Sequence, residues 1–436
     1  MKNRFIQYIS CSLLFIIGIQ HVNAQRGEWV NQVIVVNSGK FEFVPPYLDY
    51  VTVQAYDPVT HVVKVFDTIY TQSAQDVVIN GHFAYVAAQD SIIKYDLDSY
   101  QRVAAIADSG MVKLGIFKNM LIVAKQYPIK RFFVEILDQN LALLALIEGI
   151  SGDCGGVTAD KDSVYVAVNH GWQGTTGRLA VINPSNWTLV REENFGTNAI
   201  GIWNLYNYGG KVFSINRTPY GYPPVGSITG YNIYSGSFST DVLSYTIGDG
   251  AGIVDNLLYL KFDEGIGSYN LDTQTVVDPS IVPDPGSINH IYIISSGVDY
   301  VNNLLYLNIG NRTANGFGVI TTLAGDSVTS FQEGVSAECI AMDYRTPVGI
   351  QPVSMEQNQV SVYPNPVNSI LTVTIHNNDK VNEISVIDLT GITLIKNSFI
   401  GEEKKLKINC GSLSAGIYFL SIKTANGLIT RKFIKQ

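Results

Sequence analysis

Residues 76–106 contain four short apolar runs in succession, and each run ends in a tight polar turn. The runs are rich in β-branched and aromatic residues, which favour strands over helices. The pattern therefore predicts one four-stranded antiparallel sheet with strands at residues 76–79, 82–88, 91–97 and 102–106. A single sheet of this size cannot bury both of its faces, so we expect further copies stacked around an axis, as in a β-propeller.

The second strand of this sheet, with the turn before it, recurs about every 40 to 50 residues, beginning at residues 80, 118, 162, 209, 255 and 302. The third strand recurs seven times. Residues 33–39 supply the missing second strand, but no first strand precedes them, so the far end of the propeller must provide it. We predict seven blades, the first built from residues 336–344 and three strands within residues 30–70. A six-bladed ring with loose ends is the alternative.

The pattern of hydrophobic and polar residues divides the rest of the chain into further segments. Lys2 and Arg4 precede an apolar run at residues 5–19, and small side chains follow up to Ala24. Residues 1–24 are therefore typical of a secretory signal peptide, and the run is shorter than the roughly 20 residues of a membrane-spanning helix. The propeller is predicted at residues 25–346 and a polar linker at 347–359. Seven short alternating runs at residues 360–436 predict a small C-terminal β-sandwich, so the fold class is all-β.

This last segment resembles the type A C-terminal sorting domain of the type IX (Por) secretion system of Bacteroidetes. The resemblance rests on three motifs, at residues 363–366, 386–391 and 413–420, and on the basic close at residues 431–433. It implies export to the cell surface or medium, with the secretion machinery as a partner. The residues that carry the sorting signal are Tyr363, Pro364, Asn365, Pro366, Asp388, Gly391, Gly416, Tyr418 and Lys432.

Residues 26–346 more loosely resemble the YncE-like and DUF5074-type surface propellers of Bacteroidetes, whose repeats are similar to WD40 and YVTN repeats. The likeness rests on residues 33–42, on the second blade and on the repeated hydrophobic-Tyr-hydrophobic second strands. Some of those propellers sit on outer-membrane receptors and capture cobalamin or other nutrients. The resemblance thus implies a nutrient-binding role and an outer-membrane receptor as a candidate partner, without any residue that identifies the ligand.

Composition narrows the function classes. The formal net charge is −8, and residues 26–349 carry 18 Lys and Arg against 31 Asp and Glu. Nucleic acid needs a basic surface, so it is not an expected partner. Cys154, Cys339 and Cys410 form an odd set without metal-type spacing, so no disulfide framework is expected. Cys154 and Cys339 are predicted to be buried on strands near the propeller axis. No metal or cofactor is predicted.

Catalytic motifs are absent from the sequence, and its six histidines are scattered. An enzyme is therefore not supported, although a lactonase-like or lyase-like propeller is the alternative function. Such an enzyme would gather acidic residues at the axis, and Asp76, Asp153, Asp249 and Glu338 lie near blade starts. Our preferred interpretation of these residues is turn capping.

The loops between second and third strands are long, irregular and aromatic, and strand alternation places all of them on one face of the ring. We predict a ligand-binding rim there for a small molecule, a glycan or a protein, because aromatic faces and polar donors together suit sugars and planar ligands. A cluster of His, Arg and carboxylates would instead favour catalysis. The predicted rim consists of Phe43, Tyr47, Tyr127, His170, Trp172, Arg217, Tyr220, Tyr222 and Arg312.

Overall fold

The computed structural model describes residues 27–44, 47–171, 174–217, 225–286, 291–346, 360–375, 381–389, 391–398, 404–424 and 427–436. The chain separates into two compact units, Met1–Pro347 and Val348–Gln436. The predicted signal peptide and linker lie outside the described residues, so their bounds stay predictions. Among the described residues, no helix is long and apolar enough to cross a membrane.

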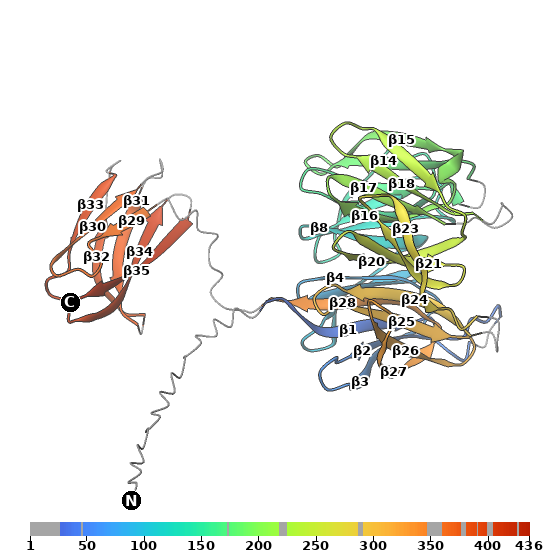
Figure 1. Ribbon diagram of the computed structural model, residues 1–436, viewed down its shortest axis with the longest axis horizontal. Coiled ribbons are helices and arrows are strands. Elements are labelled where there is room, and N and C mark those ends of the chain that lie inside the picture. Colours follow the sequence, from blue (N-terminus) through green and yellow to red (C-terminus); the bar gives the residue numbers. More distant parts are fainter. Residues whose placement is uncertain are drawn as a thin grey trace, which may run out of the picture. The chain divides into compact units, whose positions relative to one another are not determined.

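The first unit contains seven four-stranded antiparallel sheets, which are the blades of a β-propeller (Figure 1). Blade 1 consists of β28 (Ala337–Arg345), β1 (Trp29–Asn37), β2 (Val51–Tyr56) and β3 (Val63–Ile69). Blade 2 consists of β4 (Ala74–Asn80), β5 (Phe83–Ala88), β6 (Ser91–Asp96) and β7 (Gln101–Ala107). Blade 3 consists of β8 (Met111–Phe117), β9 (Met120–Lys125), β10 (Val134–Leu137) and β11 (Leu143–Leu146). Blade 4 consists of β12 (Cys154–Ala159), β13 (Val164–Val168), β14 (Gly177–Asn183) and β15 (Thr188–Gly196).

Blade 5 follows the 3₁₀ turn at Thr197–Ala199 and consists of β16 (Ile202–Tyr208), β17 (Lys211–Asn216), β18 (Ser227–Asn232) and β19 (Phe238–Val242). Blade 6 consists of β20 (Ile247–Val254), β21 (Leu257–Phe262), β22 (Gly265–Asn270) and β23 (Thr275–Pro283). Blade 7 consists of β24 (Tyr292–Asp299), β25 (Leu304–Gly310), β26 (Asn315–Thr322) and β27 (Ser327–Val335). The first strands of neighbouring blades touch all the way round the ring.

The ring closes in blade 1, where the last strand of the unit pairs with the first. Figure 1 shows β1 in blue beside β28 in orange, and their antiparallel register runs from Trp29 opposite Arg345 to Asn37 opposite Ala337. The predicted seven blades and their closure are therefore confirmed, with β28 one residue later than residues 336–344. The six-bladed alternative is wrong, because β28 completes the blade that lacked a first strand.

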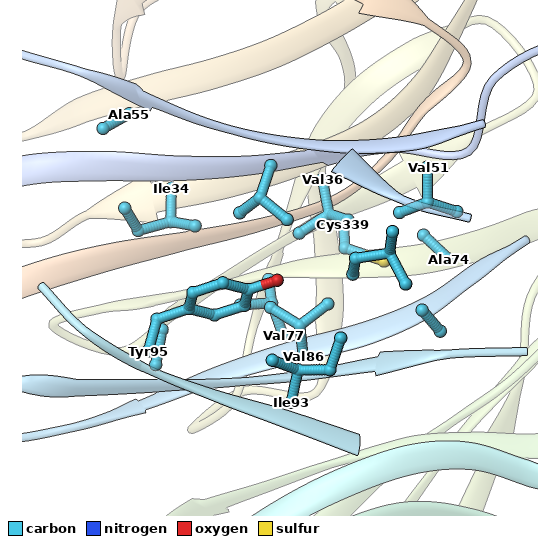
Figure 2. Close-up of a cluster of buried hydrophobic side chains, with 14 of the residues drawn as sticks. Ile34, Val36, Val51, Ala55, Ala74, Val77, Val86, Ile93, Tyr95 and Cys339 are labelled. Atoms are coloured by element: carbon cyan, nitrogen blue, oxygen red, sulfur yellow. The ribbon is translucent and has the colours of Figure 1, made fainter. Parts of the chain in front are cut away.

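Apolar faces of adjacent blades form the core. Figure 2 shows Ile34, Val36 and Cys339 of blade 1 pointing toward Val77 and Ile93 of blade 2 in one buried cluster. Along β1, Ile34 and Val36 alternate with Val33 and Val35, which belong to the buried cluster on the other face, so both faces of this strand are buried. The predicted burial of cysteines on strands near the axis is confirmed, because Cys154 and Cys339 are free, buried and on first strands.

Acidic or amide side chains stabilise the turns between third and fourth strands. In blade 2, Asp96 Oδ1 accepts hydrogen bonds from the backbone N–H groups of Asp98 (3.0 Å) and Ser99 (2.9 Å). This is an Asx turn, in which the side chain mimics a backbone acceptor. The same bond recurs after the third strands of other blades, at Asp57, Asp138, Asn183, Asn232 and Asn270.

The second unit is a β-sandwich. One sheet contains β29 (Val360–Tyr363), β30 (Ile370–Ile375) and β33 (Lys405–Asn409). The other contains β32 (Thr393–Ser398), β31 (Val381–Ile387), β34 (Gly416–Thr424) and β35 (Gly427–Lys435). Val373 and Leu406 of the first sheet share one buried cluster with Ile384, Leu420 and Phe433 of the second. The predicted small C-terminal β-sandwich is therefore present.

Candidate functional site

In every blade the first strand begins, and the second strand ends, on the same side of the ring. We call this side the loop face, because it carries the blade-to-blade connections and the loops between second and third strands. Six predicted rim residues lie in those loops: Phe43, Tyr47, Tyr127, His170, Arg217 and Arg312. Trp172, Tyr220 and Tyr222 lie outside the described residues.

An ion pair joins two first strands near the loop face. Lys113 Nζ on β8 lies 3.4 Å from Asp76 Oδ1 on β4, and Asp76 Oδ2 accepts a bond from the backbone N–H of Leu114 at 2.8 Å. Burial raises the pKa of Asp76, an effect that Lys113 offsets only in part. Burial would lower the pKa of Lys113, but the carboxylates of Asp76 and Asp249 outweigh it and raise that pKa.

A second ion pair stacks on an indole ring. The guanidinium carbon of Arg217, directly after β17, lies 3.7 Å from the centroid of the Trp203 ring on β16. Arg217 Nη1 also donates to Asp249 Oδ1 on β20 at 2.9 Å. Trp203 Nε1 is buried and has no hydrogen-bond partner among the described residues. This arrangement combines an aromatic surface, a charged donor and an acceptor in one place.

Three of the four side chains in these two ion pairs lie on first strands, which surround the axis, and the charges of the pairs act on common neighbours. Lys113 belongs to blade 3 and Asp249 to blade 6, on opposite sides of the ring, yet their charges interact. Burial raises the pKa of Tyr206 on β16, and the carboxylates of Asp249 and Asp76 raise it further. The side chains therefore converge. We call them the axial cluster, which consists of Asp76, Lys113, Trp203, Tyr206, Arg217 and Asp249.

A third ion pair links the rim to blade 1. Arg312, in the loop after β25, lies with Nη1 3.0 Å from Glu338 Oε1 on β28. Ser336 Oγ donates to the same carboxylate oxygen at 2.7 Å. Arg312 and Arg217 therefore both reach carboxylates that lie on first strands, although the sequence predicted them only as donors on the rim.

Three of the four carboxylates near blade starts do not cap turns, so that interpretation is wrong for Asp76, Asp249 and Glu338. They lie on first strands and form ion pairs because those strands surround the axis. The sequence analysis did not identify Lys113 as a candidate site residue, although the repeat contains a signal for it. When the blades are aligned, Asp76, Lys113 and Asp249 all occupy the third position of a first strand.

His170 forms a separate polar group on blade 4. Its Nε2 lies 3.3 Å from Ser151 Oγ, and that hydroxyl donates to Glu192 Oε2 at 2.7 Å. His170 has a positive φ of 56°, which is unusual for a residue other than glycine. Burial raises the pKa of neighbouring Asp153, and His170 partly opposes that shift.

The described rim aromatics are strongly exposed. Phe43 is 91% exposed, Tyr127 82% and Tyr47 42%. Phe43 packs edge-on against Phe41, with ring centroids 5.1 Å apart. Among the described residues, none of the three rim rings stacks on another of the three. The structure thus pairs Arg217 and Arg312 with carboxylates, whereas Tyr127 lies on a different loop from Phe43 and Tyr47.

Residues of the predicted sorting signal stabilise turns in the second unit through hydrogen bonds. Asn365 Oδ1 accepts a bond from the backbone N–H of Ile434 at 2.8 Å, which fixes the Tyr363–Pro366 segment against β35. Asp388 Oδ1 accepts from Ile392 N–H at 2.9 Å, and Gly391 in the same turn has a φ of +88° that disfavours other residues.

Two further sorting residues lie on β34 and one on β35. Gly416 begins β34, and the Tyr418 hydroxyl donates to the Ser414 carbonyl at 2.9 Å. Lys432 lies on β35, opposite Phe419 of β34. These contacts lie within the second unit and explain why the motifs suit a small β-sandwich. Recognition of the sorting signal therefore depends on a partner protein.

Comparison with known proteins gives different matches for the two units. Residues 361–436 match the family described as the secretion system C-terminal sorting domain. This match implies secretion or display at the cell surface. No curated protein matches the sequence.

The propeller resembles solved structures. One is a candidate 6-phosphogluconolactonase from Bacteroides uniformis, 10% identical, covering 72% of this chain and 99% of that chain with a TM-score of 0.52. Another is a candidate 6-phosphogluconolactonase from Bacteroides fragilis, 12% identical, covering 72% of this chain and 98% of that chain with a TM-score of 0.51. At such low identity the likeness supports the propeller fold alone.

Proposed function

We propose that this chain is a secreted or cell-surface binding protein whose propeller captures a glycan, peptide or nutrient at the loop face. The axial cluster is the observation that carries the proposal. It presents an indole ring, an arginine stacked on it and paired charges at the point where the blades converge. Binding sites commonly combine apolar surface with a few converging polar groups in this way.

The charges at the axis suggest what kind of ligand fits. Three acidic residues stand against three basic ones: Asp76, Asp249 and Glu338 against Lys113, Arg217 and Arg312. A ligand of large net charge would break these pairs without replacing both partners. Sugar hydroxyls and zwitterionic groups both donate and accept hydrogen bonds, so they can bind without separating the charges.

Binding can be tested with residues 25–436, the chain without its predicted signal peptide, in a screen of glycans and corrinoids by titration calorimetry. Arg217→Ala should weaken a hit at least tenfold, about 1.4 kcal/mol, because it removes the stacked donor and leaves Asp249 unpaired. Lys161→Ala is the matched control, since Lys161 is exposed in the turn between β12 and β13, on the opposite face. Unchanged affinity in Arg217→Ala would place the site elsewhere.

The aromatic rim needs its own test. Joint replacement of Trp172, Tyr220 and Tyr222 by alanine should abolish binding of the same ligand and leave the unfolding temperature unchanged. Full affinity in this triple variant would remove these residues from the rim while leaving the axial cluster as the site.

For export, we propose that residues 1–24 direct the chain to the periplasm and that the type IX machinery recognises residues 360–436 and then removes them. The sorting-domain match at residues 361–436 supports this route. Deletion of residues 350–436 in a host that has this machinery should trap the propeller in the periplasm. Normal surface display of the truncated chain would contradict the proposal.

The second candidate function is a propeller enzyme, lactonase-like or lyase-like, and the Ser151–His170 contact is the observation that brings a hydrolase to test. In a serine hydrolase the histidine takes the proton of the serine hydroxyl. Here the Ser151 hydroxyl donates to Glu192 instead, so the pair is not set for that transfer. Ester or lactone hydrolysis that Ser151→Ala abolishes would favour the enzyme over the binding protein.

A further inference from the structure

The connection from blade 1 to blade 2 displays an exposed tyrosine on the loop face. Residues 70–73 join β3 to β4, and Tyr70 at their start is 78% exposed. Tyr50, directly before β2, packs edge-on against the Tyr70 ring, with ring centroids 5.2 Å apart. The Val51 N–H donates to the Thr71 carbonyl at 3.0 Å, which fixes the connection to the start of β2. One ring therefore supports the other and leaves an aromatic surface open to solvent.

Three glutamines join this connection to the loop between the second and third strands of blade 2. Gln89 lies in that loop, and its Oε1 accepts a bond from the Gln72 backbone N–H at 2.9 Å. The Gln89 N–H donates in turn to Gln75 Oε1, and Gln75 Nε2 donates to Ser73 Oγ at 2.8 Å. These bonds hold the polar groups in fixed positions, so a ligand that binds there orders few side chains.

Two buried polar atoms in the connection have no partner within the described part of the chain. They are Thr71 Oγ1 and Gln72 Nε2, and the whole Gln72 residue is only 5% exposed. A buried donor or acceptor without a partner is unfavourable, and such groups commonly hold ordered water, which can bridge to a ligand. The unused donor and hydroxyl therefore belong to the two residues that directly follow the exposed Tyr70 ring.

The residues at this connection suit an uncharged ligand with many hydroxyl groups. We call them the amide cluster, which consists of Tyr50, Tyr70, Thr71, Gln72, Ser73, Gln75 and Gln89. None of these side chains carries a charge at neutral pH. Asp90, next to Gln89, is exposed and repels an anionic ligand. The apolar face of a sugar ring packs on an exposed tyrosine, while amides and hydroxyls exchange hydrogen bonds with sugar hydroxyls.

We propose that the amide cluster binds a neutral saccharide on the loop face, between blades 1 and 2. Tyr70 stacks on a sugar ring, the exposed Gln89 bonds to hydroxyls, and Gln72 reaches them directly or through water. Tyr70 and Gln72 are two residues apart, at most about 7 Å along the chain, so one short oligosaccharide contacts both. The proposal rests on the binding role proposed above for the loop face, but the site contains no residue of the axial cluster.

A glycan array probed with fluorescently labelled residues 25–436 tests the class of ligand. The array carries neutral oligosaccharides of glucose, mannose, galactose and xylose, and acidic oligosaccharides of uronic acids. We expect binding to neutral members and none to the uronic ones. An array on which no neutral oligosaccharide binds would overturn the proposal.

Titration calorimetry with the strongest neutral oligosaccharide then tests the site. Tyr70→Ala should lower the affinity at least tenfold, because it removes the stacking surface, and Tyr70→Phe should keep most of it, because the ring remains. Tyr234→Ala is the matched control, since Tyr234 is 85% exposed in the turn between β18 and β19, on the opposite face. Equal affinity in wild type and Tyr70→Ala would overturn the proposal.

Gln72→Met separates binding from a structural role. This substitution keeps the length of the side chain and the backbone N–H bond to Gln89, but it removes the unpartnered amide. The free variant should therefore unfold at the wild-type temperature or above it, while its affinity for the same oligosaccharide falls about fivefold. A lower unfolding temperature together with unchanged affinity would show that the amide supports the fold and overturn its assignment to the site.

Arg217→Ala distinguishes this site from the axial cluster. It should leave the affinity for the neutral oligosaccharide unchanged, because Arg217 belongs to the axial cluster alone. Loss of affinity in Arg217→Ala with full affinity in Tyr70→Ala would move the saccharide to the axis, which overturns this proposal and keeps the proposed function. Binding of a corrinoid without any saccharide would have the same meaning.

Discussion

Blade 1 packs against blade 2 on one side and against blade 7 on the other, and we call each of these interfaces a seam. The buried carboxylates in the two seams differ in whether they have a charged partner. On the blade 2 side, Asp343 is fully buried, and its carboxylate is bonded to Gln32 Nε2 at 2.9 Å and to Arg345 Nε at 2.6 Å. Arg345 in turn reaches Asp98 of blade 2 at 3.0 Å. On the blade 7 side, Glu333 is 4% exposed and has no such partner among the residues that the structure describes. The first seam compensates its charge within the protein, while burial in the second raises the pKa of Glu333 and favours its protonated, neutral form.

Removing the closing strand breaks both seams at once and should have the largest effect. A chain that stops at Gly334 lacks β28, so blade 1 loses its inner strand and exposes the edge of β1. We expect its unfolding temperature to fall by more than about 10 °C. The control is a chain that stops at Pro347, which keeps β28. Equal unfolding temperatures for the two truncated chains would contradict the role of the closure.

Asp343→Ala breaks the paired seam alone. Removing one partner of a buried ion pair leaves the other charge uncompensated, which costs about 3–5 kcal/mol. Denaturant unfolding should show this loss, and the double variant Asp343→Ala with Arg345→Met should recover part of it. Asp162→Ala is the control, because Asp162 is exposed in a turn. A double variant no more stable than Asp343→Ala would mean that the uncompensated charge is not the cause.

Glu333→Gln sharpens the comparison at the other seam. The pKa of Glu333 is about 9 in the folded chain, above its ordinary value of 4.5. Its contribution to stability is therefore full below pH 4.5 and is lost as pH rises toward 9, on the order of 3 kcal/mol by pH 7.

The glutamine cannot ionise, so Glu333→Gln should be more stable than wild type at pH 7 and equal to it near pH 4. Denaturant unfolding at a series of pH values would measure the difference. Parallel pH profiles for the two proteins would show that Glu333 keeps its ordinary pKa.

Tyr95→Phe should have the smallest effect. The Tyr95 hydroxyl on β6 donates to Asp67 Oδ2 on β3 at 2.5 Å, which joins blade 2 to blade 1 at the outer side of the apolar seam. Loss of this one bond should cost about 1 kcal/mol, because Arg102 still pairs with Asp67. A loss as large as that of Asp343→Ala would mean that the outer bond, rather than the buried ion pair, holds this seam.

Much of this architecture could be predicted from sequence, because blades repeat short-range signals. Alternation predicted the strands, and the excess of third strands over second strands predicted that β28 returns to blade 1. The axial cluster was harder, since a charged residue in a strand gives no sign of which distant strand it meets. Lys113 pairs with Asp76 only because two first strands are neighbours around the axis.

Glu333 could not be found from sequence for a related reason. Its alternation with Phe331 places it on the inward side of β27, but an acidic residue at such a position normally indicates an exposed strand end. Only the seam with blade 1 shows that it is buried. The binding role of the rim stays a prediction, because Trp172, Tyr220 and Tyr222 lie outside the described residues and, among those described, none of the other three rim rings stacks on another.

The pairing of β1 with β28 also determines which blade of the propeller is completed last. Trp29 lies at the start of the described propeller and its register partner Arg345 at the end, so blade 1 is the first to be synthesised and the last to be completed. Contacts between such distant residues form slowly, since the whole intervening chain must be ordered first. Until residue 345 is available, the ring stays open. Closure therefore requires a chain that is complete as far as residue 345, which precedes the sorting unit in the sequence.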